Sequence, residues 1–251
     1  MQVILKITGF ILIFAVTSTL SGCNYDSQAT TSYPPSDSLY VYKPPIDPNG
    51  IGKYYQGRQI AYTMDHSEAS WLERAEREKE ERTDLLLQAL DLRPTDVVTD
   101  IGAGSGYMTF RISSLVPKGK VLAVDVQQEF LNMLLDNRII KNAFNVEPIL
   151  GTVRNPNLPD QSVDVALLVD SYHEFSYPHE MLLAIKKSLK RGGRLVLVEY
   201  KAEDPYVPIK ALHRMSEKQA VKEVTGIGLK FVENQDILPL QHILVFEKTL
   251  K

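Results

Sequence analysis

The sequence predicts an α/β protein with a doubly wound, mostly parallel sheet. Short apolar runs typical of buried parallel strands recur along the chain, at residues 97–101, 121–125 and 163–170. Segments with a helical spacing of apolar residues separate these runs. The first strand also turns through three glycines directly into a helix that starts at Tyr107. The 251 residues, 44% of them hydrophobic, suffice for one sizeable core.

Residues 1–22 have the pattern of a secretory signal peptide. Lys6 precedes a mostly apolar run that is shorter than the roughly 20 residues a transmembrane helix needs. The following Leu20-Ser-Gly-Cys23 resembles the lipobox of bacterial lipoproteins. The resemblance implies cleavage before Cys23, lipidation of its thiol, and a membrane protein of the cell envelope on the periplasmic or extracytoplasmic face. Asn24 leaves the choice of membrane open, and an uncleaved anchor or a misread start codon is the alternative.

Two segments precede the predicted sheet. Residues 23–57 are rich in Ser, Thr, Tyr, Pro and Asp and are predicted to form a flexible tether. Residues 58–93 are predicted to be an N-terminal helical segment, in which Asp65 caps a helix. The charges of both signs over residues 74–82 are typical of a solvated helix face. The alternative is a lid that carries Trp71 and Arg74 over a substrate.

The turn after the first strand predicts a ligand cradle. Glycines allow close approach of the backbone to a ligand, and a helix N-terminus offers free N–H groups. A dinucleotide fingerprint, G-x-G-x-x-G, needs Gly or Ala at its last position, but Tyr107 stands there. Asp100 comes just before the first glycine, where a carboxylate would repel a pyrophosphate and would suit a cationic or amine-bearing ligand.

The run D-x-G-x-G-x-G from Asp100 to Gly106 resembles motif I of class I S-adenosylmethionine (SAM)-dependent methyltransferases. The resemblance implies that this loop lies against the methionine part of SAM. Glycines that serve packing alone are the alternative. Asp125 ends the second strand roughly 20 residues after the glycines, a spacing at which an acid reaches ribose hydroxyls. It also resembles the ribose-binding acid of this family, and capping of the next helix is its alternative role.

A third, weaker strand is predicted at residues 146–150, and the loop after it carries Thr152. In the methyltransferase family this loop lies beside the adenine, so we expect main-chain or hydroxyl contact from Thr152 at most. The residues assigned to the SAM site are Asp100, Gly102, Ala103, Gly104, Gly106, Asp125, Val126, Thr152 and Asp170.

The end of the fourth strand predicts an acceptor site. Reacting groups gather at the carboxyl ends of parallel strands beside the ligand crevice, and Asp170 to Phe175 follow this strand. His173 has an ordinary pKa near neutrality and is the candidate general base, with Glu174 to orient it or to bind substrate. A structural histidine at the crevice is the alternative. No metal ligands are assigned.

The rest of the chain fits the same fold. A helix from Pro178, a Gly192-Gly193 turn and an apolar strand ending at Glu199 resemble methyltransferases of ubiquinone and menaquinone synthesis. A capped helix over residues 216–225 and strands at 229–233 and 242–247 would complete a seven-stranded, Rossmann-like sheet with an antiparallel last strand. Residues 94–251 are therefore predicted to form the SAM-binding domain.

These observations predict a SAM-dependent methyltransferase that acts on a small-molecule acceptor. The net charge of −3 and the lack of a long basic run give no electrostatic footprint for nucleic acid. The Asn/Asp-Pro-Pro-Tyr loop of methyltransferases that act on adenine or glutamine is also absent from the sequence. Two alternatives stay open: a membrane-tethered, non-catalytic binding or scaffold protein on a methyltransferase fold, and a NAD(P) oxidoreductase, which Tyr107 and Asp100 disfavour.

Overall fold

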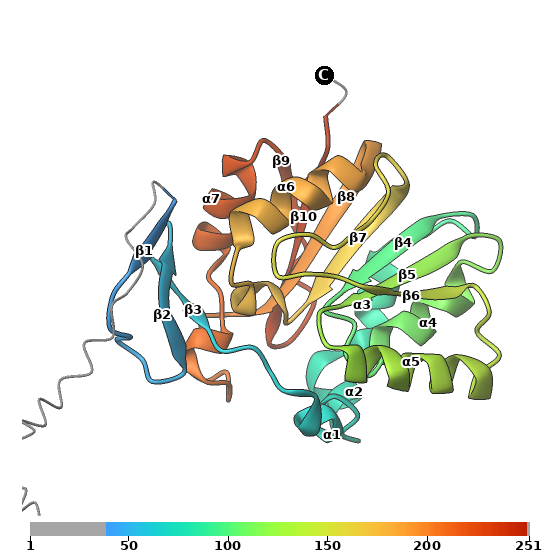
Figure 1. Ribbon diagram of the computed structural model, residues 1–251, viewed down its shortest axis with the longest axis horizontal. Helices are drawn as coiled ribbons and strands as arrows, with labels where there is room; N and C mark the ends of the chain where they lie inside the picture. The colour runs from blue at the N-terminus through green and yellow to red at the C-terminus, as the bar shows by residue number, and fades with distance from the viewer. Residues whose placement is uncertain (1–38, 250–251) are drawn as a thin grey trace, which may run out of the picture. The chain divides into compact units, whose positions relative to one another are not determined.

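The computed structural model describes residues 39–249 (Figure 1). The predicted signal peptide and the lipobox cysteine, Cys23, lie outside the described residues. Within this part of the chain, no helix combines the length and apolar character needed to cross a membrane.

A seven-stranded sheet forms the centre of the described chain, in the order β6-β5-β4-β7-β8-β10-β9. Neighbouring strands from β6 to β8 are parallel, and β10 is antiparallel to both β8 and β9. This topology confirms the predicted doubly wound sheet with an antiparallel last strand. The strands are β4 (Val97–Ile101), β5 (Lys120–Asp125), β6 (Val146–Leu150), β7 (Val163–Val169), β8 (Leu189–Tyr200), β9 (Lys230–Asn234) and β10 (Gln241–Glu247).

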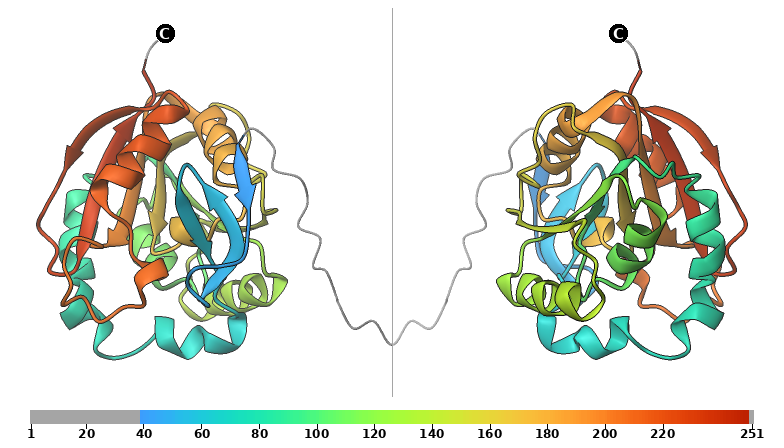
Figure 2. Two further views of the ribbon diagram at one scale, coloured as in Figure 1. Left: turned by 90° about the vertical axis from the view of Figure 1, so that its left-hand side faces the viewer. Right: turned by 90° about the vertical axis from the view of Figure 1, so that its right-hand side faces the viewer.

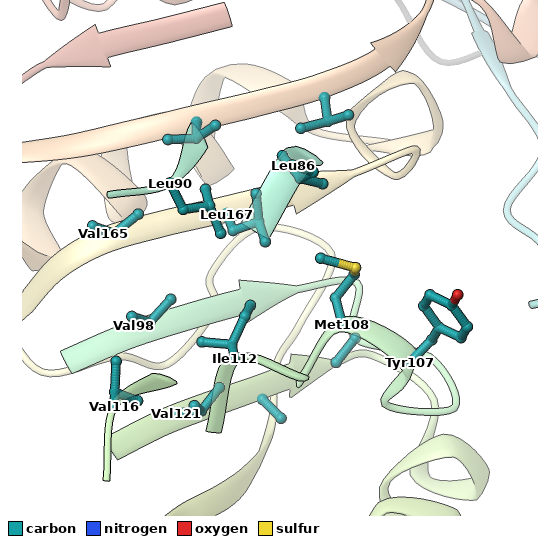
Figure 3. Packing of buried hydrophobic residues seen from close by; sticks show 14 of the residues in the cluster. Leu86, Leu90, Val98, Tyr107, Met108, Ile112, Val116, Val121, Val165 and Leu167 are labelled. Carbon is teal, nitrogen blue, oxygen red and sulfur yellow. The ribbon is translucent and has the colours of Figure 1, made fainter. Parts of the chain in front are cut away.

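Alternating strand residues face two helical layers. Val121 and Ala123 of β5 belong to a buried cluster with residues of the helices on one face, whereas Leu122 and Val124 belong to the cluster on the other face. Figure 3 shows the first cluster, with Leu86 close to Leu167. The first layer is α3 (Thr83–Ala89), α4 (Tyr107–Leu115) and α5 (Gln128–Ile140), and the second is α6 (Pro178–Ser188) and α7 (Glu217–Gly226).

The prediction of a turn at Gly192 and Gly193, ahead of strand β8, is wrong. Gly192 and Gly193 are inside β8, rather than in a turn that precedes it. The pairing between β7 and β8 shifts register here, because Val163 pairs with Leu189 and Val165 with Arg194. The extra residues form a bulge, and Gly192 has a positive φ of 72° that suits glycine.

The predicted tether is wrong for residues 40–42 and 50–55, which form strands. These strands belong to a small antiparallel sheet of β1 (Tyr40–Tyr42), β2 (Gly50–Tyr55) and β3 (Arg58–Ala61). Tyr40, Tyr55 and Ile60 are its buried cluster. The small sheet lies against the two helices of the second layer (Figure 2), where Tyr40 Oη donates to Glu180 of α6.

The segment between the two sheets contains short helices. A 3₁₀ turn, η1 (His66–Glu68), precedes α1 (Ala69–Leu72) and α2 (Arg77–Glu81). Asp65 caps the turn as predicted, because its carboxylate accepts the Ser67 amide at 2.9 Å. The prediction of a solvated charged face is wrong for Arg77 and Glu81, which are both buried. They pair with each other at 2.9 Å, which satisfies both charges without water.

One buried ion pair joins the small sheet to the main domain. Arg58 of β3 donates from Nε and Nη2 to both carboxylate oxygens of Glu223 in α7, at 2.8 and 3.0 Å. The Tyr172 hydroxyl donates to the same carboxylate at 2.7 Å. Arg58 Nη1 also donates to the main-chain oxygen of His173 at 3.0 Å. The small sheet is thus fixed to the loop that carries the predicted acceptor residues.

We expect Arg58→Met to lower the free energy of unfolding by about 3–5 kcal/mol, because it leaves the carboxylate of Glu223 buried without its cation. Lys120→Met is the matched control. It removes a cation from an exposed pair with Glu147, which should cost less than about 1 kcal/mol. Urea denaturation of both variants measures the difference. Equal decreases in the free energy of unfolding would show that the Arg58–Glu223 pair stabilises the protein no more than the exposed pair does.

Candidate active site

The glycine loop after β4 has a backbone that only glycine adopts readily. Gly102, Gly104 and Gly106 have φ values of 79°, 54° and 89°. A Cβ atom on Gly102 would come within 2.7 Å of Ser171 Cβ, and one on Gly104 within 2.7 Å of Leu72 Cδ1. The loop is therefore packed closely between neighbouring segments, and its glycines leave the main chain accessible at the cavity wall.

Asp125, at the end of β5, lies beside this loop. Its Oδ2 accepts the Gly104 amide at 3.0 Å and its Oδ1 accepts the Gln127 amide at 2.9 Å. Burial raises the pKa of this carboxyl, although the amide donors oppose the shift. A carboxylate can accept further hydrogen bonds beyond these two. The capping and ligand-binding roles considered for Asp125 are therefore compatible in one geometry.

A cavity opens between the glycine loop, β5 and the turn after β7. It takes in six of the sequence-predicted site residues: Gly102, Gly104, Asp125, Val126, Asp170 and Glu174. Trp71, Leu72 and Arg77 close it from the N-terminal helical segment. Phe130 and Val153 add apolar wall. A ligand with polar and apolar parts suits this lining.

Four residues assigned to the SAM site are not in the lining of this cavity. Asp100 lies behind the loop, where it accepts from Thr109 Oγ1 at 2.6 Å. Ala103 is buried, and Gly106 is the N-cap residue of α4. Thr152 forms a local turn in which its hydroxyl accepts the Asn155 amide at 3.0 Å, while its neighbour Val153 lines the cavity.

Trp71 and Arg77 line the cavity, although neither was assigned to the SAM site, and Trp71 was placed near a ligand only in the alternative of a lid. Trp71 lines this cavity and the one next to it, and the guanidinium of Arg74 lies 4.0 Å from its ring centre. Arg77 was assigned to a solvated face, but it stacks on Tyr107 at 4.1 Å. The motif's tyrosine, in the place of a small residue, is the signal that could have suggested a stacking partner.

Asp170 lies in the wall that the two cavities share. Its φ is +47°, a conformation in which Asp is more common than most residues. Oδ2 accepts from Gln241 Nε2 at 2.6 Å, but the buried Oδ1 accepts no hydrogen bond from any described residue. Burial raises the pKa of this carboxyl well above its ordinary value. A positively charged ligand group at this position would satisfy the oxygen and favour its ionisation.

The neighbouring cavity has a volume of about 860 Å³ and contains His173, Glu174 and His213. His173 Nε2 lies 3.1 Å from His213 Nδ1. Glu174 Oε1 lies 3.7 Å from the first of these nitrogens and 3.5 Å from the second. His213 comes from the short 3₁₀ turn η3 (Ala211–His213), far from the others in sequence.

The other ring nitrogen of His173 is held by Glu199. Oε2 of this buried carboxylate lies 2.6 Å from Nδ1, and Oε1 accepts the Tyr172 amide at 2.9 Å. Burial alone would lower the pKa of His173, but the charge of Glu199 and contacts with Glu174 raise it to about 10. In this arrangement His173 holds a proton at neutral pH, which does not favour it as a lone general base.

The comparisons with known proteins agree with the fold and with the glycine loop. Residues 99–197 match the family described as "Methyltransferase domain". The chain is 28% identical over 142 residues to the uncharacterised methyltransferase YcgJ of Bacillus subtilis, over 55% of either chain. It is 29% identical over 111 residues to the ubiquinone/menaquinone biosynthesis C-methyltransferase UbiE of Ectopseudomonas mendocina, over 43% of either chain. The chain thus spans about half the length of these relatives.

A solved structure of a SAM-dependent methyltransferase from Aquifex aeolicus has the same fold. It superposes with a TM-score of 0.70 at 23% identity and covers 74% of this chain and all of its own. Fold and site thus define a cofactor-binding α/β domain of the doubly wound class. Residues 99–197 match a methyltransferase domain, and the fold is shared with a SAM-dependent methyltransferase, so SAM is the cofactor against which the site is compared.

The residues present fit this cofactor. The glycine loop leaves main chain open to the cavity, Asp125 offers acceptors for ribose hydroxyls, and the orphan Oδ1 of Asp170 suits a positive charge such as a sulfonium or ammonium group. Asp125 and the loop would hold the ribose and methionine parts.

Asp100 makes the stability of the protein without ligand depend on pH. Burial raises the pKa of its carboxyl from 3.8 to about 6, against the hydrogen bond from Thr109. The native state therefore keeps a proton that the unfolded state releases. The contribution of protonated Asp100 to the free energy of unfolding is complete below about pH 4 and is lost as the pH rises through about 6.

We expect Asp100→Asn to be more stable than the wild type at neutral pH, by up to ~3 kcal/mol, with the difference disappearing under acid conditions. Denaturant unfolding across this pH range gives the measurement. Asp84→Asn is a control of opposite sign, because the hydrogen bond from Arg82 lowers the pKa of the exposed Asp84 to about 2. A pH-independent difference for Asp100→Asn would contradict the assigned pKa.

Proposed function

We propose that this protein transfers the methyl group of SAM to a small-molecule acceptor that binds in the cavity of His173, Glu174 and His213. The observation that supports this proposal most directly is that the cofactor cavity and this second cavity share one wall. Trp71, Asp170 and Glu174 line both of them. A methyl group held at this wall would face an acceptor on its other side.

SAM supplies an electrophilic methyl group on a positively charged sulfur. The reaction needs in-line attack, so the task of the protein is to align two molecules and to exclude water. Asp125 and the glycine loop orient the cofactor from one side, and Asp170 favours the positive charge near the shared wall. Trp71 covers both cavities, which supports the hypothesis that its segment acts as a lid.

The second cavity supports a polar, small acceptor. Besides the two histidines and Glu174, it includes Tyr200 and Lys210, and its volume of about 860 Å³ is in the range of small-molecule sites. The charge balance of the chain still gives no footprint for nucleic acid. We therefore propose a small molecule rather than a macromolecule as acceptor.

We also propose that Cys23 carries a lipid anchor at the cell envelope. The lipobox pattern supports this location, which raises a conflict, because SAM is made in the cytoplasm. A non-catalytic binding or scaffold protein on the methyltransferase fold is therefore the second candidate function. Binding of the cofactor separates the two candidates.

Calorimetric titration of the full chain in detergent with SAM, S-adenosylhomocysteine and NAD tests the cofactor. We expect SAM and S-adenosylhomocysteine to bind and NAD not to bind. Asp125→Ala should weaken SAM binding at least about tenfold, because the ribose hydroxyls lose a charged acceptor. Asp136→Ala, an exposed acid on α5, should keep the wild-type affinity. Unchanged affinity in a folded Asp125→Ala protein would refute the assignment of the ribose site.

The lipid anchor has its own test. Intact-mass analysis of the protein purified from bacterial membranes should show a chain that begins at Cys23 and carries acyl groups. Cys23→Ser should lack this mass and should not be cleaved before residue 23. Recovery of unmodified wild-type protein from the soluble fraction would exclude the anchor.

A further inference from the structure

The three side chains that meet in the second cavity have the spacing of ligands around one metal ion. Around a four-coordinate zinc, bonds of about 2.0–2.2 Å place neighbouring ligand atoms roughly 3.3–3.5 Å apart. The corresponding separations here are 3.1 Å between His173 Nε2 and His213 Nδ1, and 3.5 and 3.7 Å from these nitrogens to Glu174 Oε1. All three ligand atoms lie within 4.8 Å of one another.

We propose that His173, Glu174 and His213 bind a divalent transition-metal ion, zinc in the first instance, at the floor of the acceptor cavity. Two imidazoles and one carboxylate form the set of protein ligands found in zinc sites that keep a position open for substrate. All three residues line the cavity, so the remaining coordination position would face an acceptor.

The surroundings of the ligands support a built site. A metal-binding histidine commonly donates its second N–H to a carboxylate, which fixes the ring and its tautomer. Glu199 Oε2 stands 2.6 Å from His173 Nδ1 in this manner. Glu174 is oriented as well, because its Oε2 accepts the Met64 amide at 3.0 Å and its Oε1 is left to face the histidines.

Charge and proton balance also fit a divalent cation. With Nδ1–H donated to Glu199, His173 would bind the metal through a neutral Nε2, and His213 would bind through Nδ1. Any proton on the two metal-binding nitrogens would leave to solvent when the ion binds. The charges of Glu174 and Glu199 would then neutralise the ion, so that no net charge is buried.

The use of such an ion rests on the proposed function. A metal held by these residues would bind an acceptor oxygen and lower the pKa of its hydroxyl, so that the hydroxyl proton would leave to solvent without a separate base. The oxygen would then attack the methyl carbon, so that an O–C bond forms while the C–S bond of SAM breaks and S-adenosylhomocysteine leaves. We therefore infer that the acceptor is a hydroxyl-bearing molecule. This also gives a role to His173, whose ring nitrogens are both engaged in the structure.

Metal uptake by the full chain tests the site. The protein in detergent is stripped with a chelator, incubated with Zn²⁺, freed of excess ion, and its metal content is measured by elemental analysis. We expect one zinc per chain in the wild type and in Cys23→Ser, which removes the thiol as a competing ligand. Replacement by Co²⁺ should give the intense visible absorption of a tetrahedral site.

His213→Ala and Glu174→Gln should lose the zinc and the cobalt spectrum. Glu199→Gln should keep the ligands but bind zinc about 10–100-fold more weakly, because it supports His173. His66→Ala is the matched control, since His66 lies outside the cluster, and it should bind zinc like the wild type. Zinc should raise the melting temperature of the wild type and leave that of His213→Ala unchanged.

Failure of this proposal is distinguishable from failure of the proposed function. His213 is not in the lining of the cofactor cavity, so His213→Ala should bind SAM normally. Asp125→Ala should conversely retain zinc. A folded wild-type protein that takes up no zinc, or a His213→Ala protein that takes up as much as the wild type, would show that the two histidines merely share a proton.

Discussion

The reversal of strand order beside β4 is the constraint on which the site depends. β4 lies between β5 and β7, so the chain leaves its carboxyl end toward one face while β7 leads toward the other. Such a point leaves a crevice at the edge of the sheet that no connection covers. The hydrogen bond from Ser171 Oγ to the Ile101 main-chain oxygen, 2.9 Å, joins the ends of β4 and β7 across this crevice. The glycine loop after β4 and the turn after β7, residues 170–175, are thereby neighbours.

Two buried ion pairs lie beside the crevice, and in each the two charges balance one another within 3 Å. Arg58 of the small sheet pairs with Glu223 of α7 and also holds the turn after β7 through the main-chain oxygen of His173. Arg77 and Glu81 stabilise the segment that covers the cofactor cavity. Burial of single charges would be costly, whereas these pairs are fixed in position by their hydrogen bonds. Asp170 is the exception, since one of its oxygens has no donor among the described residues. That imbalance is expected where a charged ligand completes the site.

The sequence predicted the central sheet well because its apolar periodicity is strict. Runs such as Val121–Val124 are buried on both faces and leave few alternatives to a parallel strand. The small sheet was missed because two of its three buried core residues, Tyr40 and Tyr55, are tyrosines in a Pro- and Ser-rich segment, a composition that also suits a tether. Arg77 was misassigned because burial of a charge depends on a partner that only the fold brings near. His213 lies in a segment without periodicity, 40 positions after His173, so no spacing rule connects the two.

The placement of β10 has a consequence for the biogenesis of the protein. β9 is the edge strand of the central sheet and pairs with β10, which in turn pairs with β8. Residues up to Asn234 can therefore leave the ribosome before the strand that connects β9 to the sheet has been made. Until Gln241–Glu247 emerges, the edge of β8 stays open to pairing with other chains. A nascent chain stalled in this interval would expose a long apolar strand, so emergence of Gln241–Glu247 completes the sheet and removes this hazard of aggregation.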